Sequence, residues 1–238
     1  MKLVEQNCLH CKYARNCIPK GLPIENVANY LSVPIRQALS SKGVTLFSER
    51  EKANSFYRVI HGSLKLSSTN IEGDEHIYGL PMSGDIVALD AYSEEEFHYT
   101  ASAMTPTVVC KIPYKHLEFA MGEDASIQTN FYKLMSSSIN EAREQKNGLS
   151  GQKKACKKQL LVGFLLKSSL KLTPKGKGQF LLPMKFSDVA SYLGLTSEHI
   201  SRTLAKLVTA GYITKSGKLI EIINREKLEY LYLKGFNE

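Results

Sequence analysis

The sequence of 238 residues predicts an α+β protein: a roll of antiparallel strands, then one long helix, then a winged helix-turn-helix. Three observations predict this class. Strand-like runs alternate with glycine turns in the first half, a helical rhythm crosses the middle, and a glycine separates two amphipathic helices near the end. The expected segments are an N-terminal cysteine segment (1–20), the roll (21–122), the long helix (123–148) and the winged domain (149–238).

The first half of the chain is strand-like from about residue 45 to residue 113. Short runs that alternate apolar and polar residues, such as 63–67, are separated by turns at 72–74 and 83–85. Half-buried strands show this period of two because successive side chains point to opposite faces of a sheet. Regular turns between such strands predict an antiparallel roll or sandwich.

The middle of the chain is helical in pattern. Between residues 124 and 146 there is no Pro or Gly, and apolar residues recur every three or four positions. Such a helix could pack on its own domain or on a second copy of the chain, and its length favours a two-fold seam between copies. The residues predicted to form this dimer seam are Ile127, Phe131, Leu134 and Ile139.

The C-terminal segment has the pattern of two helices around a tight turn. Ser187 can cap the first helix, Gly194 can end it in the left-handed conformation, and Thr196 can cap the second. The apolar residues of the second helix expected to pack inward are Ile200, Leu204, Leu207 and Val208. The residues expected on its outer face are Glu198, Ser201, Arg202 and Ala205.

This outer face suits the major groove of DNA. An arginine can donate two hydrogen bonds to guanine, a glutamate can accept one from the cytosine amino group, and a serine can reach several base edges. Residues 214–218 predict a hairpin tip, the wing, which would bring Lys215 and Lys218 near phosphate. The alternative is an ordinary charged surface helix, which the caps and the glycine turn disfavour.

The formal net charge of +8 is unevenly distributed. Residues 1–142 hold 13 Lys and Arg against 16 Asp and Glu, whereas residues 143–238 hold 18 against 7. A basic C-terminal part suits a phosphate backbone, although a lysine-rich solvated surface would have the same composition. No run approaches the roughly 20 apolar residues of a membrane span and no signal peptide is visible, so we expect a cytoplasmic protein without a membrane partner.

Four cysteines form the most specific pattern in the chain. Cys8, Cys11 and Cys17 crowd into the N-terminal segment, and Cys110 lies in a strand-like run before Pro113. In a reducing cytoplasm, clustered cysteines bind metal or do redox chemistry more often than they form structural disulfides. The compact spacing is typical of a metal or iron–sulfur ligand set.

On these residues the chain resembles the CRP/FNR family of bacterial transcription regulators, and within it the oxygen-sensing FNR branch. The resemblance covers nearly the whole chain. The motifs that carry it are Cys8-x2-Cys11-x5-Cys17, the run 107–113 around Cys110, and Gly194-Leu-Thr-x-Glu198-x-Ile-Ser201-Arg202. The helix motif alone would fit the whole superfamily, whereas the cysteine pattern is specific to the branch.

The resemblance implies a cyclic-nucleotide-binding-like roll and an oxygen-responsive regulator of anaerobic genes, not an enzyme. A [4Fe-4S] cluster is implied on Cys8, Cys11, Cys17 and Cys110. The cluster-loaded homodimer would read palindromic TTGAT-like DNA sites through Glu198, Ser201 and Arg202, and RNA polymerase would be a partner. An oxidised cluster with four thiolates carries a charge of minus two, which nearby Lys12 and Arg15 would partly offset.

Other chemistries of the cysteines remain open. Zinc could bind the same four cysteines, or three of them and His10, and a thiol-redox site is also possible. The five-residue gap before Cys17 is longer than structural zinc pairs usually have. Cys156 lies outside the pattern and is expected to be a bystander.

The roll is not expected to bind other cofactors. Between Lys65 and Lys111 the sequence has no Lys or Arg but eight Asp or Glu, so a cyclic nucleotide would lack a positive partner for its phosphate. His76 and His98 could be haem ligands, and with His61 they could serve a metal enzyme. None of the three has the tight spacing that such an enzyme site needs.

Two residues depart from the pattern of the best-known relative. Asn16, just before the third cysteine, stands where that relative has leucine, and a polar side chain there could change how oxygen or water reaches a cluster. Ala142 stands where that relative has an aspartate, which we expect to hinder dimerisation. The expectation that the cluster-free form is monomeric is therefore weaker for this chain.

Overall fold

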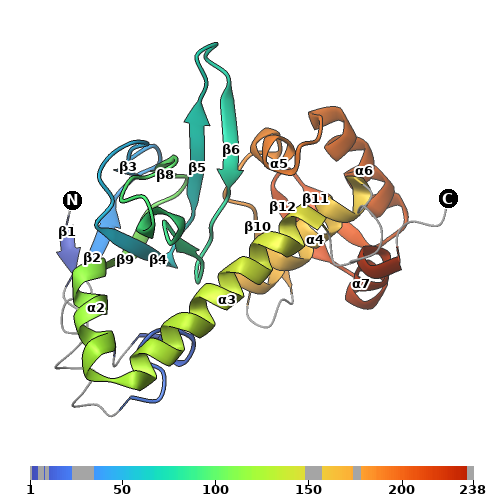
Figure 1. Ribbon diagram of the computed structural model, residues 1–238. Coiled ribbons are helices and arrows are strands. Elements are labelled where there is room, and N and C mark those ends of the chain that lie inside the picture. Colours follow the sequence, from blue (N-terminus) through green and yellow to red (C-terminus); the bar gives the residue numbers. More distant parts are fainter. Residues whose placement is uncertain are drawn as a thin grey trace. The chain divides into compact units, whose positions relative to one another are not determined.

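A computed structural model of the chain describes residues 2–4, 8, 11–22, 35–147, 157–173 and 178–234 (Figure 1). Contacts form two compact units, Met1–Asn140 and Glu141–Glu238, and the division falls inside one long helix. The four segments expected from the sequence, with boundaries at residues 20, 122 and 148, remain a prediction.

The N-terminal unit contains two antiparallel sheets, as the sequence predicted. The first has the order β1 (Lys2–Val4), β2 (Ile35–Leu39), β9 (Thr107–Pro113), β4 (Ser55–His61) and β7 (Ile86–Val87). The second has the order β3 (Thr45–Phe47), β8 (Thr100–Ala103), β5 (Leu64–Thr69) and β6 (Glu75–Gly79). Two short 3-10 helices, η2 (Ala14–Asn16) and η3 (Asp90–Tyr92), belong to the same unit.

The inward faces of the two sheets enclose an aromatic and aliphatic core. Phe47 stacks on Phe97 with ring centroids 3.8 Å apart, and Val59 and Leu64 are fully buried. In β4 every residue except His61 is buried, which is unusual for an antiparallel strand with one solvated face. Both faces of β4 are therefore covered, one by the core between the sheets and the other by the cysteine segment together with Tyr114 and Phe131.

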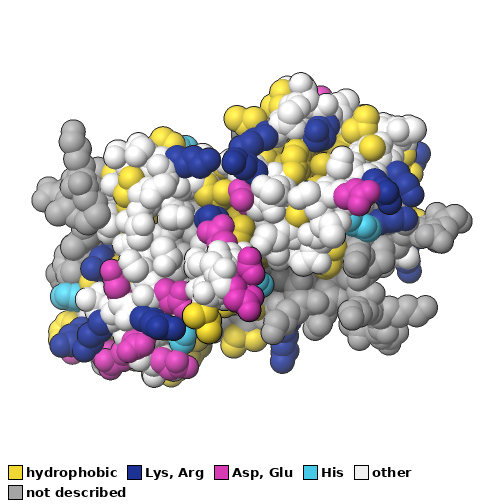
Figure 2. Space-filling model, turned by 90° about the horizontal axis from the view of Figure 1, so that it is seen from above, with side chains coloured by type: hydrophobic (Ala, Val, Ile, Leu, Met, Phe, Trp, Pro, Cys, Tyr) yellow, Lys and Arg dark blue, Asp and Glu magenta, His cyan; other side chains and the backbone are white. Residues whose placement is uncertain are grey.

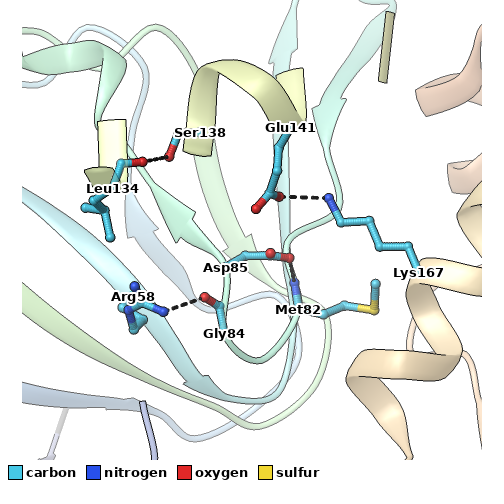
Figure 3. A network of polar contacts seen from close by, with 8 residues as sticks. All are labelled: Arg58, Met82, Gly84, Asp85, Leu134, Ser138, Glu141 and Lys167. Carbon is cyan, nitrogen blue, oxygen red and sulfur yellow. Dashed lines mark hydrogen bonds and ion pairs between the residues drawn. The ribbon is translucent and has the colours of Figure 1, made fainter. Parts of the chain in front are cut away.

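Two helices follow the roll, α2 (Tyr114–Glu123) and the predicted long helix α3 (Ala125–Asn147) (Figure 1). On α3, Ile127 and Phe131 are buried in the core of the protomer's own roll, and Leu134 packs against that core. The same stripe continues to Ser138, whose hydroxyl donates to the Leu134 carbonyl at 3.1 Å (Figure 3).

The sequence-based assignment of the dimer seam is therefore wrong for Ile127 and Phe131. A side chain that is already buried in its own protomer has no surface left for a partner. The predicted seam residues belong to two different stripes of α3. Ile127, Phe131 and Leu134 face the roll, whereas Ile139 is 54% exposed.

The C-terminal unit is a helix-turn-helix with a wing, as predicted. Its helices are α4 (Lys157–Leu172), α5 (Phe186–Leu193), α6 (Ser197–Thr209) and α7 (Arg225–Lys234). Its antiparallel sheet has the order β10 (Gln179–Leu181), β12 (Leu219–Ile222) and β11 (Ile213–Ser216). None of the helices in the described part of the chain is long and apolar enough to cross a membrane.

The turn between α5 and α6 follows the predicted chemistry. Gly194 ends α5 with φ 64°, a left-handed conformation that costs glycine little. The Thr196 hydroxyl accepts a hydrogen bond from the His199 backbone N–H at 3.1 Å and so caps α6.

Two details of the predicted helix pair are wrong. The cap of α5 is Lys185, not Ser187: the Lys185 backbone N–H donates to the Asp188 carboxylate at 3.0 Å, and the helix begins at Phe186. On α6, Ile200, Leu204 and Leu207 are buried as expected, but Val208 is 42% exposed. Its angular position places it at the edge of the apolar stripe.

Candidate functional site

The outer face of α6 presents the residues predicted to read DNA. Glu198, Ser201, Arg202 and Ala205 are all exposed. Arg202 donates to Glu198 across 2.6 Å, and their side chains are 75% and 71% exposed. Surface ion pairs of this kind contribute roughly 0–1 kcal/mol, so the pair can open at little cost when base edges compete for either group.

The wing lies in the hairpin of β11 and β12, as predicted. Gly217 forms its tip with φ 58°, and Lys215 is exposed while Lys218 is partly buried. The Lys215 ammonium lies 5.2 Å from the centre of the Phe186 ring, at the start of α5. Basic and acidic side chains are interspersed on the face drawn in Figure 2.

All four predicted cysteines line one hollow in the N-terminal unit. The empty space within it, open solvent included, is about 390 Å³. The side chains that line it are Cys8, Cys11, Ala14, Cys17, Ile18, Pro19, Arg58, Ile60, Cys110 and Ile112. None of the four thiols is in a disulfide.

Backbone turns bring the three N-terminal cysteines together. Cys11 N–H donates to the Cys8 carbonyl, Ala14 N–H to the Cys11 carbonyl, and Cys17 N–H to the Ala14 carbonyl, at 3.2, 2.9 and 3.4 Å. Successive turns of this kind curl the segment, so residues 8, 11 and 17 can share one hollow. Cys110 comes from β9, the central strand of the first sheet, and gives the site a rigid wall.

Burial keeps the thiols of Cys8 and Cys110 protonated in the absence of a bound cation. It raises the pKa of Cys8 to about 12, with smaller contributions from Cys17 and Cys11, while Arg36 partly opposes the shift. Burial, followed by the three neighbouring cysteines, also raises the pKa of Cys110 well above its ordinary value. A metal-containing group would therefore have to displace protons as it binds.

The donor set that lines the hollow consists of four thiols. No three His, Cys, Asp or Glu side chains among the residues that the structure describes could hold one metal ion together. Thiolates are ligands of structural zinc and of iron–sulfur clusters alike. His10 and Cys156, on which other expectations rested, lie outside the described residues.

The positive charge next to the thiols comes from residues that the sequence did not single out. Lys12 and Arg15, which were expected to offset the cluster charge, are exposed and do not line the hollow. Arg58 does line it, and Arg36 lies directly across from Cys110 in the strand pairing. The only sign in the sequence was a charged residue, Arg58, within the apolar run of β4. Its relation to the cysteines becomes clear only when the pairing of β4 with β9 is known.

The cysteine segment is docked onto the roll. The Nη1 of Arg58 donates to the Gly84 carbonyl, and its Nη2 to the Asn16 carbonyl, each at 2.9 Å. Figure 3 shows Arg58 reaching Gly84 beside the turn that Asp85 closes by accepting the Met82 N–H at 2.9 Å. A Cβ on Gly84 would stand 3.2 Å from the Tyr13 ring, so that ring packs directly on this turn.

The same segment is also tied to α3. The Asn130 side-chain amide donates to the Ile18 carbonyl at 2.9 Å and to the Lys20 carbonyl at 2.8 Å. Both acceptors follow Cys17 closely in the chain. Asn130 therefore joins the cysteine segment to the long helix, and sequence periodicity gave no sign of it.

A second stripe on α3 is exposed except at Met135, which is partly buried and packs against the core of the roll. Gln128, Tyr132, Met135 and Ile139 are spaced by four, three and four residues, and Tyr132 and Ile139 are 61% and 54% exposed. This alternation is the heptad pattern of a two-helix seam, and it continues to the exposed Ala142. The neighbouring Glu141 is paired with Lys167 of α4 at 2.9 Å (Figure 3).

Two family models match the chain. Residues 40–124 match the cyclic nucleotide-binding domain, and residues 160–231 match the Crp-like helix-turn-helix domain. The chain is 30% identical over 227 residues to the fumarate and nitrate reduction regulatory protein of Escherichia coli (strain K12), a match that covers 94% of this chain and 90% of that protein. The protein of the same name from Salmonella typhi gives the same identity and coverage.

Solved structures agree with this assignment. FixK2 from Bradyrhizobium japonicum has a TM-score of 0.71 at 26% identity and covers 84% of this chain and 97% of its own. A CRP/FNR-family regulator from Thermus thermophilus has a TM-score of 0.63 at 20% identity, covering 83% and 97%, which shows the fold alone. The named relatives are regulators rather than enzymes, and the chain belongs to the CRP/FNR family of transcription regulators.

Proposed function

We propose that this regulator senses oxygen through a [4Fe-4S] cluster on Cys8, Cys11, Cys17 and Cys110. As a cluster-loaded homodimer it binds palindromic TTGAT-like DNA sites and controls anaerobic genes, with RNA polymerase as its partner. The observation that carries the proposal is that Cys110 and the three N-terminal cysteines, about 90 residues away in sequence, line one hollow.

The residues of the hollow fit such a cluster. Thiolates are its preferred ligands, and the donor set consists of four thiols. The hollow also contains a buried N–H, the Nε of Arg58, that has no partner among the described residues. When bound, a cluster of this type supplies a thiolate-ligated inorganic centre that oxygen destroys.

The chain's own contacts suggest how the cysteines influence DNA binding. Coordination by all four cysteines would hold the segment against β9, whereas without it the segment keeps only contacts such as those of Arg58 and Asn130. A change in the segment would pass through Asn130 to α3 and alter the dimer seam. This is a two-state equilibrium that ligation biases.

The exposed stripe of α3 is the better candidate for the seam. Pairing through Tyr132, Met135 and Ile139 would place two copies of α6 about 34 Å apart, one DNA turn, on a palindromic site. On each half-site Glu198, Ser201 and Arg202 would meet base edges, and Lys215 and Lys218 would meet phosphate. We do not propose a cyclic nucleotide as effector, because the roll has no Lys or Arg between residues 65 and 111 to pair with its phosphate.

The proposal is tested by purifying the protein under argon and measuring iron and acid-labile sulfide. We expect about four of each per chain in the native protein, and strongly reduced iron in Cys110→Ser and Cys17→Ser. Zinc in place of iron would support the alternative metal centre, and a metal-free protein with reversible disulfides would support a thiol-redox site. Either result would overturn the cluster proposal.

A further inference from the structure

Arg58 is a buried cation on β4. Its side chain is only 6% exposed, and the neighbouring residues of the strand are buried as well. Arginine is seldom buried to this extent unless it is paired, because removing its charge from water is costly. The position therefore requires a compensating partner.

The described residues provide only part of that compensation. Nη1 and Nη2 donate to the backbone carbonyls of Gly84 and Asn16, which are neutral acceptors. Tyr13 adds a ring 5.6 Å from the guanidinium carbon. Nε has no acceptor, and no carboxylate in the described part of the chain pairs with the guanidinium.

The position of Arg58 identifies where the missing partner would be. In the pairing of β4 with β9, Arg58 lies directly opposite Cys110, so both side chains are on the same face of the sheet. Ile60 and Ile112, each two residues further along, line the hollow on that face as well. The unpaired donor therefore belongs to the wall of the cysteine hollow.

We propose that Arg58 provides a buried positive charge and an Nε–H donor to the anionic, thiolate-ligated group held in this hollow. The inference rests on the proposed cluster function. Four thiolates give the oxidised group a charge of minus two, which apolar walls stabilise poorly. Hydrogen bonds and positive charge near the sulfurs favour the more reduced, more negative state and raise the reduction potential.

The same arginine also holds the segment through Asn16, so the test must separate charge from docking. The measurement is the midpoint potential of the cluster under argon, by titration with dithionite. One electron passes from dithionite to the iron, and the charge of the group changes from minus two to minus three with no bond made or broken. Arg58→Gln keeps a donor without charge, and Arg58→Lys keeps charge without the planar fork.

We expect Arg58→Gln to shift the midpoint potential to a more negative value and Arg58→Lys to restore part of the shift. The matched control is Arg15→Gln, which removes the same charge from an exposed position in the cysteine segment and should leave the potential nearly unchanged because solvent screens it. A smaller shift in Arg58→Gln than in Arg15→Gln would overturn the inference.

The remaining outcomes are also decisive. If the native protein contains iron and sulfide but the midpoint potential of Arg58→Gln equals that of the native protein, the role of Arg58 is refuted and the cluster function stands. If the native protein contains no iron, the cluster function fails and the inference fails with it. If Arg58→Gln loses iron, retention of iron in Arg58→Lys supports the role of the positive charge. Equal loss of iron in both variants overturns it and leaves Arg58 only the docking of the cysteine segment through Asn16.

Discussion

Arg202 and Glu198 lie one turn apart on the exposed face of α6 and pair with each other in the free protein. Because both side chains are highly exposed, the ion pair is weak and can open at little cost in free energy. The guanidinium can then exchange the carboxylate for guanine O6 and N7, while the glutamate turns to a cytosine amino group.

Arg202→Ala should therefore relax discrimination at one guanine of the half-site and cost about 1–3 kcal/mol on the specific sequence. Fluorescence anisotropy with the specific duplex and with duplexes substituted at that base measures both effects. Ala205→Ser, on the same exposed face, is a control that keeps the arginine. Unchanged discrimination in Arg202→Ala would remove α6 from the major groove.

Lys215 belongs to the wing and should behave differently. Its ammonium is held near Phe186 and faces no base in the proposed arrangement. Lys215→Ala should weaken binding to all sequences by a similar factor and reduce the slope of log affinity against log salt by about one. A loss confined to the specific duplex would mean that the wing reads bases.

At the scale of elements, α3 has two stripes with different partners. Ile127 is fully buried in the roll, whereas Ile139 is exposed on the neighbouring stripe. Ile127→Ala should destabilise the N-terminal unit by about 2–5 kcal/mol, because it leaves a cavity. Chemical denaturation monitored by circular dichroism measures this loss.

Ile139→Glu should leave the stability of the protomer nearly unchanged but weaken the dimer, since it places like charges across a two-fold seam. Sedimentation equilibrium of the cluster-loaded protein under argon measures the dimer constant. Lys133→Glu, on an exposed position outside the stripe, is the control. A dimer as strong as the native one in Ile139→Glu would exclude this stripe as the seam.

Asn130 is the described polar link between the cysteine segment and α3, through two hydrogen bonds to Ile18 and Lys20. Asn130→Ala should retain the four cysteine ligands and their iron but show a smaller difference in dimer strength between the argon and air states. The exposed neighbour Thr129→Ala serves as control. An undiminished difference in Asn130→Ala would show that coupling takes another route.

Sequence patterns predicted most elements because their causes are local. Gly194 and Thr196 set the helix-turn-helix turn by their own conformational and capping chemistry, and the alternation in β5 follows from its two faces. The face of α3 that meets the roll could not be predicted, because apolar residues occur on both of its stripes. Which of them is buried depends on the packing of the roll.

The cysteine site was predictable in its ligands but not in its surroundings. Spacing and residue type identified Cys8, Cys11, Cys17 and Cys110, and the structure brings them to one hollow. Arg58 and Arg36 were missed because their relation to Cys110 exists only through strand pairing across β2, β9 and β4. Asn130 was missed because its partners are backbone carbonyls about 110 residues away in sequence.

At the scale of the whole molecule, one chain contains an N-terminal hollow lined by four thiols and a C-terminal face that suits DNA. The central claim is that the state of the hollow determines the affinity for DNA. The thiol-lined hollow and the DNA-facing helix lie in different units, each with its own core, so this dependence can be measured only on the full chain.

The most direct test follows one sample of the full chain from argon into air. Cluster absorbance and anisotropy of a labelled palindromic duplex are recorded together at fixed protein concentration. We predict that DNA affinity falls in step with the loss of absorbance and returns when iron and sulfide are restored under argon. DNA affinity that stays constant while the absorbance disappears would contradict the claim.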